Sequence, residues 1–383
     1  MENIFITKIH VGKVRHLQNF DIEVSDKDRK HLILTGKNGS GKTSLLEQMS
    51  SVMFDIGKKF VKNQGIASNL WEIGIANIVA DDIKNVEPMS LNIIFSGIKK
   101  PYFTRLYIPA KRSLNMHMPK NIEKVDIKDK LNINADLSRD FLKYIIYLDY
   151  QRLRAKTDED RERLQKWFDR FESALKDIYN CPELHLEPIP DDLLFKVTMP
   201  GIESFGLNEM ADGYSAFLDI IIELMLRMDN GSAVVDTDLP GIVLIDEIET
   251  HLHIELQKKV LPFLTKMFPN IQFIVSTHSP FVISSISNAV VFDLENKRRV
   301  EDLSAYSWET IVECYFEAGQ YSHVMTEKFN RYRELYHKER SHDEEKDFLR
   351  ARAELSTIIS PAQKELYNAF SQMELNLSGK AAK

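Results

Sequence analysis

Hydrophobic and polar residues alternate along residues 3–24, with one interruption near residues 16–19. An alternation with a period of two is typical of a strand that buries one face, so this segment predicts a β-hairpin. Three further β-forming runs lie at residues 73–80, 90–95 and 102–108. We expect these three runs to form an antiparallel sheet.

Apolar side chains recur at spacings of three and four between about residues 138 and 180. This period predicts a helical arm with one packed stripe. The stripe consists of Leu164, Trp167, Phe168, Phe171, Leu175 and Ile178. Pro188 and Pro190 end the arm, and a β-like pair follows at residues 193–198 and 202–205.

The most apolar part of the chain has a strand–helix–strand pattern. A strongly apolar helix is expected at residues 215–228. Residues 241–245 and 271–275 are continuous apolar runs, which are typical of buried parallel strands. A helical segment at residues 254–267 lies between these two runs, so their order predicts a βαβ unit.

The segment Gly36–Thr43 fits the phosphate-binding loop pattern G-x-x-x-x-G-K-[ST] at every fixed position. In such a loop, backbone N–H groups surround the phosphates of a nucleotide at the start of a helix. Lys42 then supplies a mobile positive charge, and the Thr43 hydroxyl is placed to bind Mg²⁺. The residues expected to contact ATP are Gly36, Asn38, Gly39, Ser40, Gly41, Lys42, Thr43 and Ser44.

Two carboxylates, Asp246 and Glu247, follow the apolar run 241–245 directly. They are expected at the carboxyl edge of a buried strand, where the ligands of open α/β sheets bind. Asp246 is suited to the Mg²⁺ shell, and Glu247 is suited to orient or deprotonate the attacking water. His278 follows the next strand and is expected to sense the γ-phosphate and hold that water. The alternative for His278 is a loop histidine held by hydrogen bonds.

The composition is ordinary for a globular protein, with 28% charged residues, 43% hydrophobic residues and a formal charge of −7. Cys181 and Cys314 are the only cysteines and lie far apart, so neither a disulfide framework nor a zinc site is implied. No apolar run is long enough to span a bilayer, and the first residues lack the features of a signal peptide. We therefore expect a soluble, cytoplasmic protein with no membrane partner.

One stretch is clearly basic, because residues 97–130 contain nine Lys and Arg against three acids. The stretch could follow the phosphate backbone of a nucleic acid, or it could be a solvated loop that acids elsewhere balance. Its basic residues are Lys99, Lys100, Arg105, Lys111, Arg112, Lys120, Lys124, Lys128 and Lys130. In contrast, residues 321–350 contain equal numbers of acids and bases, which favours a solvated helical hairpin at this end of the chain.

Three segments carry a resemblance to a known family. Residues 36–43, 242–253 and 273–280 resemble the Walker A segment, the Walker B segment with its D-loop, and the H-loop of ABC-type ATPases. The resemblance is closest to SMC-like DNA-repair ATPases, OLD-family proteins and the ATPase subunits of bacterial phage-defence systems such as Septu and PARIS. It implies an α/β fold, namely a P-loop NTPase of ABC-ATPase type with an antiparallel β subdomain, a helical arm and C-terminal helices. It also makes His251 and His253 D-loop residues rather than metal ligands.

The family's signature loop, Leu-Ser-x-Gly followed by a helix, should precede Walker B. Residues 210–214 occupy that place, and the resemblance implies that Ala211, Asp212 and Gly213 contact the γ-phosphate bound to the opposite subunit of a head-to-tail dimer. Ala211 stands where the family usually has Ser, which removes one hydroxyl contact. Gln151 is the candidate for the family's Q-loop.

These features divide the chain into four parts. We expect an N-terminal ATPase lobe with Walker A and the antiparallel β segments at residues 1–110, and an insertion with the basic loop and helical arm at 111–190. A C-terminal ATPase lobe with the signature, Walker B and H-loop is expected at 191–300, and a helical extension at 301–383.

The leading hypothesis is a dimeric switch that binds and hydrolyses ATP with Mg²⁺ and controls a separate effector protein, such as a nuclease, in antiviral defence. The expected assembly is a homodimer or a larger assembly of dimers. The alternative is a DNA-binding, repair-type ATPase that acts directly on nucleic acid. A scaffold that binds ATP without turnover would have little use for Glu247. A ring-forming AAA+ motor would need an arginine finger in place of the signature loop.

Overall fold

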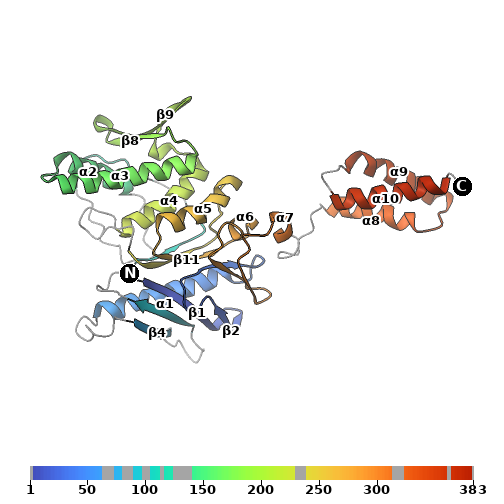
Figure 1. The fold of residues 1–383 in the computed structure, drawn as a ribbon, viewed down its shortest axis with the longest axis horizontal. Coiled ribbons are helices and arrows are strands. Elements are labelled where there is room, and N and C mark those ends of the chain that lie inside the picture. The colour runs from blue at the N-terminus through green and yellow to red at the C-terminus, as the bar shows by residue number, and fades with distance from the viewer. Residues whose placement is uncertain are drawn as a thin grey trace. The chain divides into compact units, whose positions relative to one another are not determined.

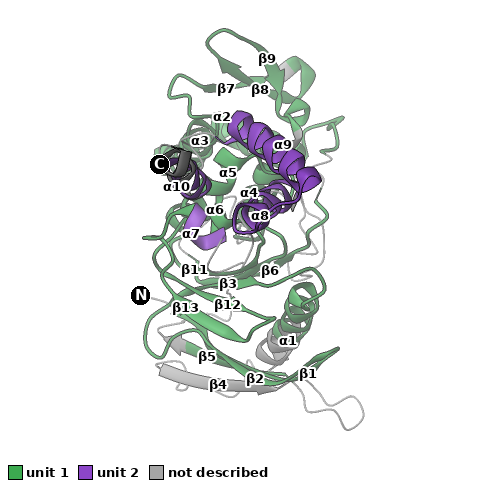
Figure 2. Cartoon of the chain, turned by 90° about the vertical axis from the view of Figure 1, so that its right-hand side faces the viewer, with its two compact units in different colours: residues 1–308 green, residues 309–383 purple. Residues whose placement is uncertain are grey.

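The computed structural model describes residues 3–62, 73–79, 89–96, 104–112, 116–123, 140–228, 239–312, 323–359 and 364–381. The chain forms two compact units, Met1–Trp308 and Glu309–Lys383 (Figure 2). The short helix α7 (Trp308–Thr310) contains the division. None of the described helices is long and apolar enough to cross a membrane.

A six-stranded sheet forms the centre of the first unit. Its order is β13-β12-β3-β11-β10-β6, and every neighbouring pair is parallel except β12 and β13. The strands are β3 (His31–Thr35), β6 (Thr104–Ile108), β10 (Gly241–Ile245), β11 (Ile271–Ser276), β12 (Ala289–Asp293) and β13 (Arg298–Glu301). All residues of β3, β10, β11 and β12 are buried, as their continuous apolar runs require in a sheet that is covered on both faces.

A second, antiparallel sheet has the order β2-β1-β5-β4. Its strands are β1 (Asn3–Val14), β2 (Leu17–Glu23), β4 (Ile73–Val79) and β5 (Ser90–Ser96). The predicted hairpin at residues 3–24 is confirmed by the pairing of β1 with β2. The prediction for residues 102–108 was wrong, because β6 pairs in parallel with β10 and belongs to the central sheet. Its short alternating pattern did not distinguish an edge strand of a parallel sheet from an antiparallel strand.

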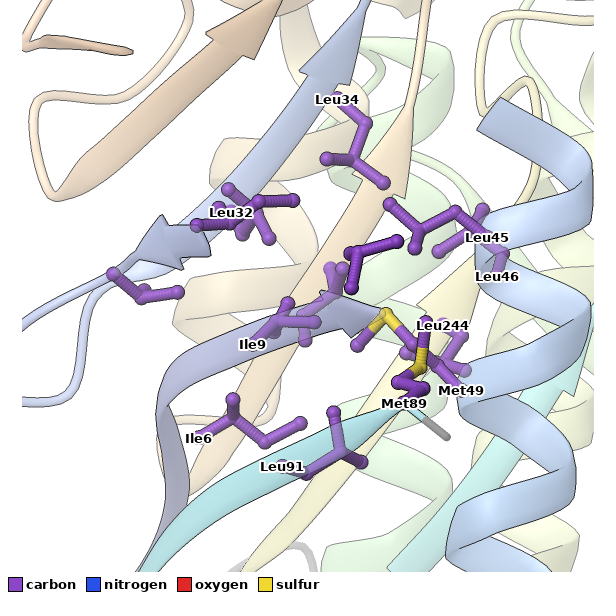
Figure 3. Packing of buried hydrophobic residues seen from close by; sticks show 14 of the residues in the cluster. Ile6, Ile9, Leu32, Leu34, Leu45, Leu46, Met49, Met89, Leu91 and Leu244 are labelled. Carbon is purple, nitrogen blue, oxygen red and sulfur yellow. The ribbon is translucent and has the colours of Figure 1, made fainter. Parts of the chain in front are cut away.

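Helix α1 (Lys42–Lys62) joins the two sheets. Figure 3 shows Leu45, Leu46 and Met49 on α1 beside strand residues of both sheets, including Ile9 of β1 and Leu244 of β10. These side chains belong to one buried hydrophobic cluster. The packing fixes the first turn of α1, which follows the phosphate-binding loop, against the ends of the central strands.

One buried amide also ties the sheets together. Gln272 of β11 accepts a 2.7 Å hydrogen bond from the Ile6 N–H of β1, and its Nε2 donates to the carbonyls of Ile6 at 3.0 Å and Lys30 at 2.8 Å. The Gln272 side chain is buried, so these bonds satisfy polar groups that water does not reach. The antiparallel sheet is thus held in register with the central sheet.

Helices α4 and α5 lie on the side of the central sheet opposite α1, and the arm lies beyond them (Figure 1). The predicted βαβ unit is confirmed, with α5 between β10 and β11. The predicted helical arm is also confirmed as two helices, α2 and α3, which are followed by a three-stranded sheet. These elements are α2 (Phe141–Arg154), α3 (Asp158–Tyr179), β7 (His185–Ile189), β8 (Leu194–Met199), β9 (Ile202–Gly206), α4 (Asp212–Met228), α5 (Ile254–Met267) and α6 (Pro280–Ile283).

The second unit contains α8 (His323–Tyr336), α9 (His342–Ile358) and α10 (Lys364–Ala381). The predicted helical hairpin was therefore incomplete, since a third helix packs with the first two around a hydrophobic core of the unit's own. Tyr332, Phe348 and Phe370 meet at the centre of this core, with ring centroids 5.2 to 5.3 Å from Tyr332. A solvated hairpin has no need of such a buried aromatic cluster.

Candidate nucleotide site

The carboxyl ends of the parallel strands meet at one edge of the central sheet. The phosphate-binding loop follows β3, Asp246 and Glu247 follow β10, and His278 follows β11. Adjacent parallel strands bring these loops together although they are distant in the sequence. The structure thus places the predicted Walker A, Walker B and H-loop residues at the same edge.

The phosphate-binding loop has the backbone that its glycines permit. Gly36, Gly39 and Gly41 have φ angles of 129°, 84° and 99°, which residues with a Cβ rarely adopt. A Cβ at Gly36 would also lie 2.8 Å from the Ser40 hydroxyl oxygen. The Ser40 hydroxyl is buried and has no hydrogen-bond partner among the described residues. It remains available as a donor inside the loop.

The Lys42 ammonium folds back over its own loop. Its Nζ donates to the carbonyls of Gly36 at 2.8 Å and Lys37 at 3.1 Å. Burial lowers the pKa of Lys42, and the negative charges of Glu247 and Asp246 oppose this shift. A buried cation that is already directed into the loop is suited to bind the β- and γ-phosphate oxygens of a nucleotide.

Thr43 and Asp246 are in direct contact. The Thr43 hydroxyl donates to Asp246 Oδ2 at 2.8 Å, while the Ser276 hydroxyl donates to Asp246 Oδ1 at 2.6 Å. Both oxygens of the buried carboxylate are therefore held in place. Thr43 and Asp246 offer the hard oxygen ligands that Mg²⁺ prefers, so these two residues fit the cation that the fold implies.

Glu247 occupies a constrained position in the turn after β10. Its φ angle is 43°, in the left-handed region that is unusual for a residue with a side chain. The Glu247 N–H donates to the Ser276 hydroxyl at 2.7 Å, and Glu247 Oε2 accepts from the Thr250 hydroxyl at 3.2 Å. The strained backbone and these two bonds fix the direction of the carboxylate, which is half-buried.

Ser276 is a site residue that the sequence reasoning missed. One hydroxyl donates to Asp246 and accepts from the backbone of Glu247, so it orients both acids of the Walker B segment. The available signal was its position as the last residue of β11, next to the strand that carries the acids.

His278 lies in the same site, in surroundings that disfavour its charged form. Burial and the nearby charge of Lys42 lower the pKa of its imidazole, against the opposing effect of Glu249. The backbone N–H of His278 donates to Glu249 Oε1 at 2.5 Å. Its Nε2 is buried and has no partner among the described residues, as is also true of Glu249 Oε2. Glu249 was not predicted as a site residue, although it is the third acid after β10.

The proposed signature residues begin α4 and lie against the D-loop of the same chain. A Cβ at Gly213 would lie 3.1 Å from the carbonyl oxygen of His251 and 3.1 Å from the imidazole of His253, so only glycine fits without displacement. Ala211 is exposed.

Within the described part of the chain, no group of three or more His, Cys, Asp or Glu side chains could hold a metal ion.

Two further predictions concern Gln151 and the basic stretch. Gln151, the candidate for the Q-loop, lies on α2, where its Nε2 donates to the Tyr147 hydroxyl at 2.9 Å. Arg112, from the basic stretch, is buried and cannot reach a nucleic acid in this conformation. Lys111 and Lys120 are exposed. Five other lysines of that stretch fall outside the described residues: Lys99, Lys100, Lys124, Lys128 and Lys130.

The chain is similar to several known proteins. Residues 97–284 match the model of a family described as "AAA domain, putative AbiEii toxin, Type IV TA system". The protein named Retron Ec83 probable ATPase, from Escherichia coli, is 36% identical over 124 residues, which are 30% of this chain and 22% of that protein. Septu protein PtuA from Bacillus mycoides (strain KBAB4) is 25% identical over 309 residues, which are 77% of this chain and 41% of that protein.

The matched part of the chain spans less than half the length of both relatives. Among solved structures, the crystal structure of an SMC head bound to the C-winged helix domain of ScpA aligns with a TM-score of 0.41 and 13% identity, covering 75% of this chain and 94% of that chain. The sequence matches confirm a resemblance to the ATPases of phage-defence systems: the chain is similar to the retron and Septu proteins, and its family match is to an AAA domain.

Proposed function

We propose that this chain binds ATP with Mg²⁺ and hydrolyses it to ADP and phosphate. The observation that carries the proposal is the 2.8 Å bond between Thr43 and Asp246, which joins the Walker A and Walker B segments into one site. Thr43 and Asp246 would hold Mg²⁺, which would supply positive charge to neutralise the triphosphate. The residues of the phosphate-binding loop, from Gly36 to Ser44, would hold the triphosphate.

Glu247 orients and deprotonates the attacking water in this proposal. Its carboxylate is held by a left-handed backbone and by Thr250, so it needs little rearrangement before reaction. The His278 imidazole would share a hydrogen bond with the same water or with the γ-phosphate through its Nε2, which has no partner among the described residues. A positioned general base contributes roughly 10²- to 10⁴-fold to a rate, so Glu247 carries a large share of the chemical step.

ATP also acts as the signal of a dimeric switch in this proposal. Ala211, the exposed residue that precedes α4, would contact the γ-phosphate bound to a second copy, with the backbone N–H groups of Asp212 and Gly213 facing the anion. An isologous dimer would close two identical sites, and hydrolysis would release it. By similarity to the retron and Septu ATPases, the switch would serve antiviral defence and control a separate effector protein.

Light scattering on the purified chain tests the switch. The Glu247→Gln protein retains ATP, so it should form dimers when ATP and Mg²⁺ are added and return to monomers when ATP is removed. The Lys42→Ala protein should remain monomeric under the same conditions. A Glu247→Gln protein that binds ATP and stays monomeric would contradict the dimeric switch. A wild-type protein that releases no phosphate from ATP would contradict the proposed activity.

A further inference from the structure

Arg112 occupies a place in the site that its position in a basic stretch did not suggest. It follows β6 by four residues and is only 6% exposed. Its side chain crosses to the turn that follows the neighbouring strand, β10. The two strands stay paired up to this turn, because the Asp246 N–H donates to the Ile108 carbonyl at 2.8 Å.

The guanidinium binds four backbone carbonyls of that turn. Nη1 donates to the carbonyl of Asp246 at 3.0 Å. Nη2 faces the carbonyls of Glu247 at 2.9 Å, Ile248 at 3.2 Å and Thr250 at 3.4 Å. These carbonyls converge because Glu247 adopts a left-handed conformation, and a planar group with several fixed donors is suited to hold them together.

The charge of Arg112 is balanced within the site. Burial lowers its pKa, and the negative charges of Asp219, Glu249, Asp246 and Glu247 act in the opposite direction. Asp219 lies on α4, the helix that begins at the proposed signature loop. Arg112 therefore lies close to both the catalytic turn and the helix that would respond to a second subunit.

We propose that Arg112 is a positioning residue that holds Glu247 in its reactive orientation through the carbonyls of residues 246–250. The inference rests on the proposed ATP hydrolysis, because it assigns a role toward Glu247. Arg112 does not contact the nucleotide in this proposal. Its loss should therefore slow the chemical step and leave ATP binding nearly unchanged.

Steady-state ATP hydrolysis by the full chain tests this role. Arg112→Met should lower kcat at least about 10-fold and change KM by less than about threefold, because a displaced catalytic group affects the rate more than ground-state binding. Arg112→Lys should recover part of the loss, since an ammonium can reach some of the carbonyls but lacks the fork of donors. Arg152→Met on α2 is the control, because Arg152 also donates several hydrogen bonds, to the side chains of Gln165 and Asp149, but lies in the arm. Its kcat should equal that of the wild type.

A double variant separates positioning from a general loss of stability. If Arg112 acts through Glu247, adding Arg112→Met to Glu247→Gln should cause almost no further loss of kcat. An equal fold-loss in both backgrounds would overturn the inference, as would a folded Arg112→Met protein with the wild-type kcat. If circular dichroism shows that Arg112→Met does not fold, Arg112→Lys decides: a kcat at least about threefold below wild type at unchanged KM supports the role, and a wild-type kcat overturns it.

The two proposals fail in different ways. An inactive wild-type chain would overturn the proposed hydrolysis and, with it, the role of Arg112. An active wild-type chain with unaffected Arg112 variants would overturn the role of Arg112 alone.

Discussion

The Thr43 hydroxyl and the Asp246 carboxylate form a 2.8 Å hydrogen bond across a sequence separation of 203 residues. Thr43 lies in the first turn of α1, and Asp246 is the first residue after β10. The bond exists because β3 and β10 each pair with β11 in the same parallel sheet. It places two oxygen ligands of the proposed Mg²⁺ site within contact distance before any ligand binds.

Replacing Thr43 with valine should weaken the response to Mg²⁺. Valine keeps the shape of the side chain but removes the oxygen ligand, so the Mg²⁺ concentration for half-maximal ATP hydrolysis should rise at least about 10-fold, or about 1.4 kcal/mol. A magnesium titration of phosphate release measures this shift. Thr265→Val on α5 is the control, because the Thr265 hydroxyl only donates to the Pro262 carbonyl. A Thr43→Val titration identical to that of the wild type would rule out Thr43 as a ligand.

Gln272 should contribute strongly to the stability of the first unit. Gln272→Met keeps the length of the side chain but removes three hydrogen bonds to the backbone of residues 6 and 30. The buried groups left without partners should lower the free energy of unfolding by about 3 kcal/mol. Urea unfolding followed by tryptophan fluorescence reports on this unit, since every tryptophan of the sequence falls at or before residue 308, where the unit ends.

The exposed Gln165 provides the control for Gln272. Its side chain bonds only to other side chains of the arm, so Gln165→Met should change the free energy of unfolding by less than about 0.5 kcal/mol. Equal effects of the two substitutions would show that the Gln272 bonds do not hold the sheets together.

His31 should make the first unit less stable in acid. Burial, aided by the charge of Arg29, lowers the pKa of His31 from 6.5 to about 4, and its Nδ1 accepts a hydrogen bond from the Phe273 N–H at 3.0 Å. Because the pKa of His31 is lower in the folded state, the unfolded chain binds more protons than the folded chain between about pH 4 and pH 6.5. The contribution to stability is therefore complete above pH 6.5 and is lost as the pH falls toward 4.

His31→Asn removes this titration and keeps an acceptor for the Phe273 N–H. Between pH 7 and pH 5, the wild type should lose about 2 kcal/mol more unfolding free energy than His31→Asn does. Urea unfolding at the two pH values, followed by tryptophan fluorescence, gives both losses. Equal losses in the two proteins would show that His31 is not buried in its neutral form.

Local patterns predicted much of this fold and site. The phosphate-binding loop, the acids after β10 and His278 were identifiable because each follows a short run of buried β-formers, and parallel strands end at a common edge. The arm was predicted because its apolar stripe follows the period of a helix. These features depend on neighbouring residues in the sequence.

Features that depend on distant parts of the chain were not predicted. Strand β6 is identical in local pattern to an antiparallel strand, and only its partner β10 determines its sheet. Arg112 had the appearance of a surface charge, because nothing near it in the sequence indicates that four carbonyls of residues 246–250 surround it. The apolar run of β12 was a signal for a strand that the sequence analysis left unused.

Ala211 should set the strength of the proposed dimer. Ala211→Ser restores a hydroxyl that can donate to the γ-phosphate of a second subunit, which should stabilise the ATP-bound dimer by about 1 kcal/mol, or roughly fivefold in its dissociation constant. Ala211→Glu places a negative charge there and should prevent dimerisation while each monomer still binds ATP. Light scattering in the Glu247→Gln background measures both effects. Dimers of unchanged affinity in both variants would place the signature contact elsewhere.

Gly213 is less suitable for this test. A side chain at residue 213 would first meet the His251 carbonyl of its own chain, at 3.1 Å from the Cβ, so a substitution would disturb the D-loop as well as any second subunit. Ala211 is exposed and avoids this conflict.

The central claim is that one site binds ATP through Lys42 and hydrolyses it through Glu247, and one paired measurement tests it. ATP dissociation constants and single-turnover hydrolysis rates are determined for Lys42→Ala and Glu247→Gln beside the wild type. Lys42→Ala should weaken ATP binding at least about 10-fold, because it removes the buried ammonium that is proposed to bind the phosphates. Glu247→Gln should bind ATP within about threefold of the wild type and hydrolyse it at least about 100-fold more slowly. Equal loss of binding in both variants, or a wild-type hydrolysis rate in Glu247→Gln, would contradict the assigned roles.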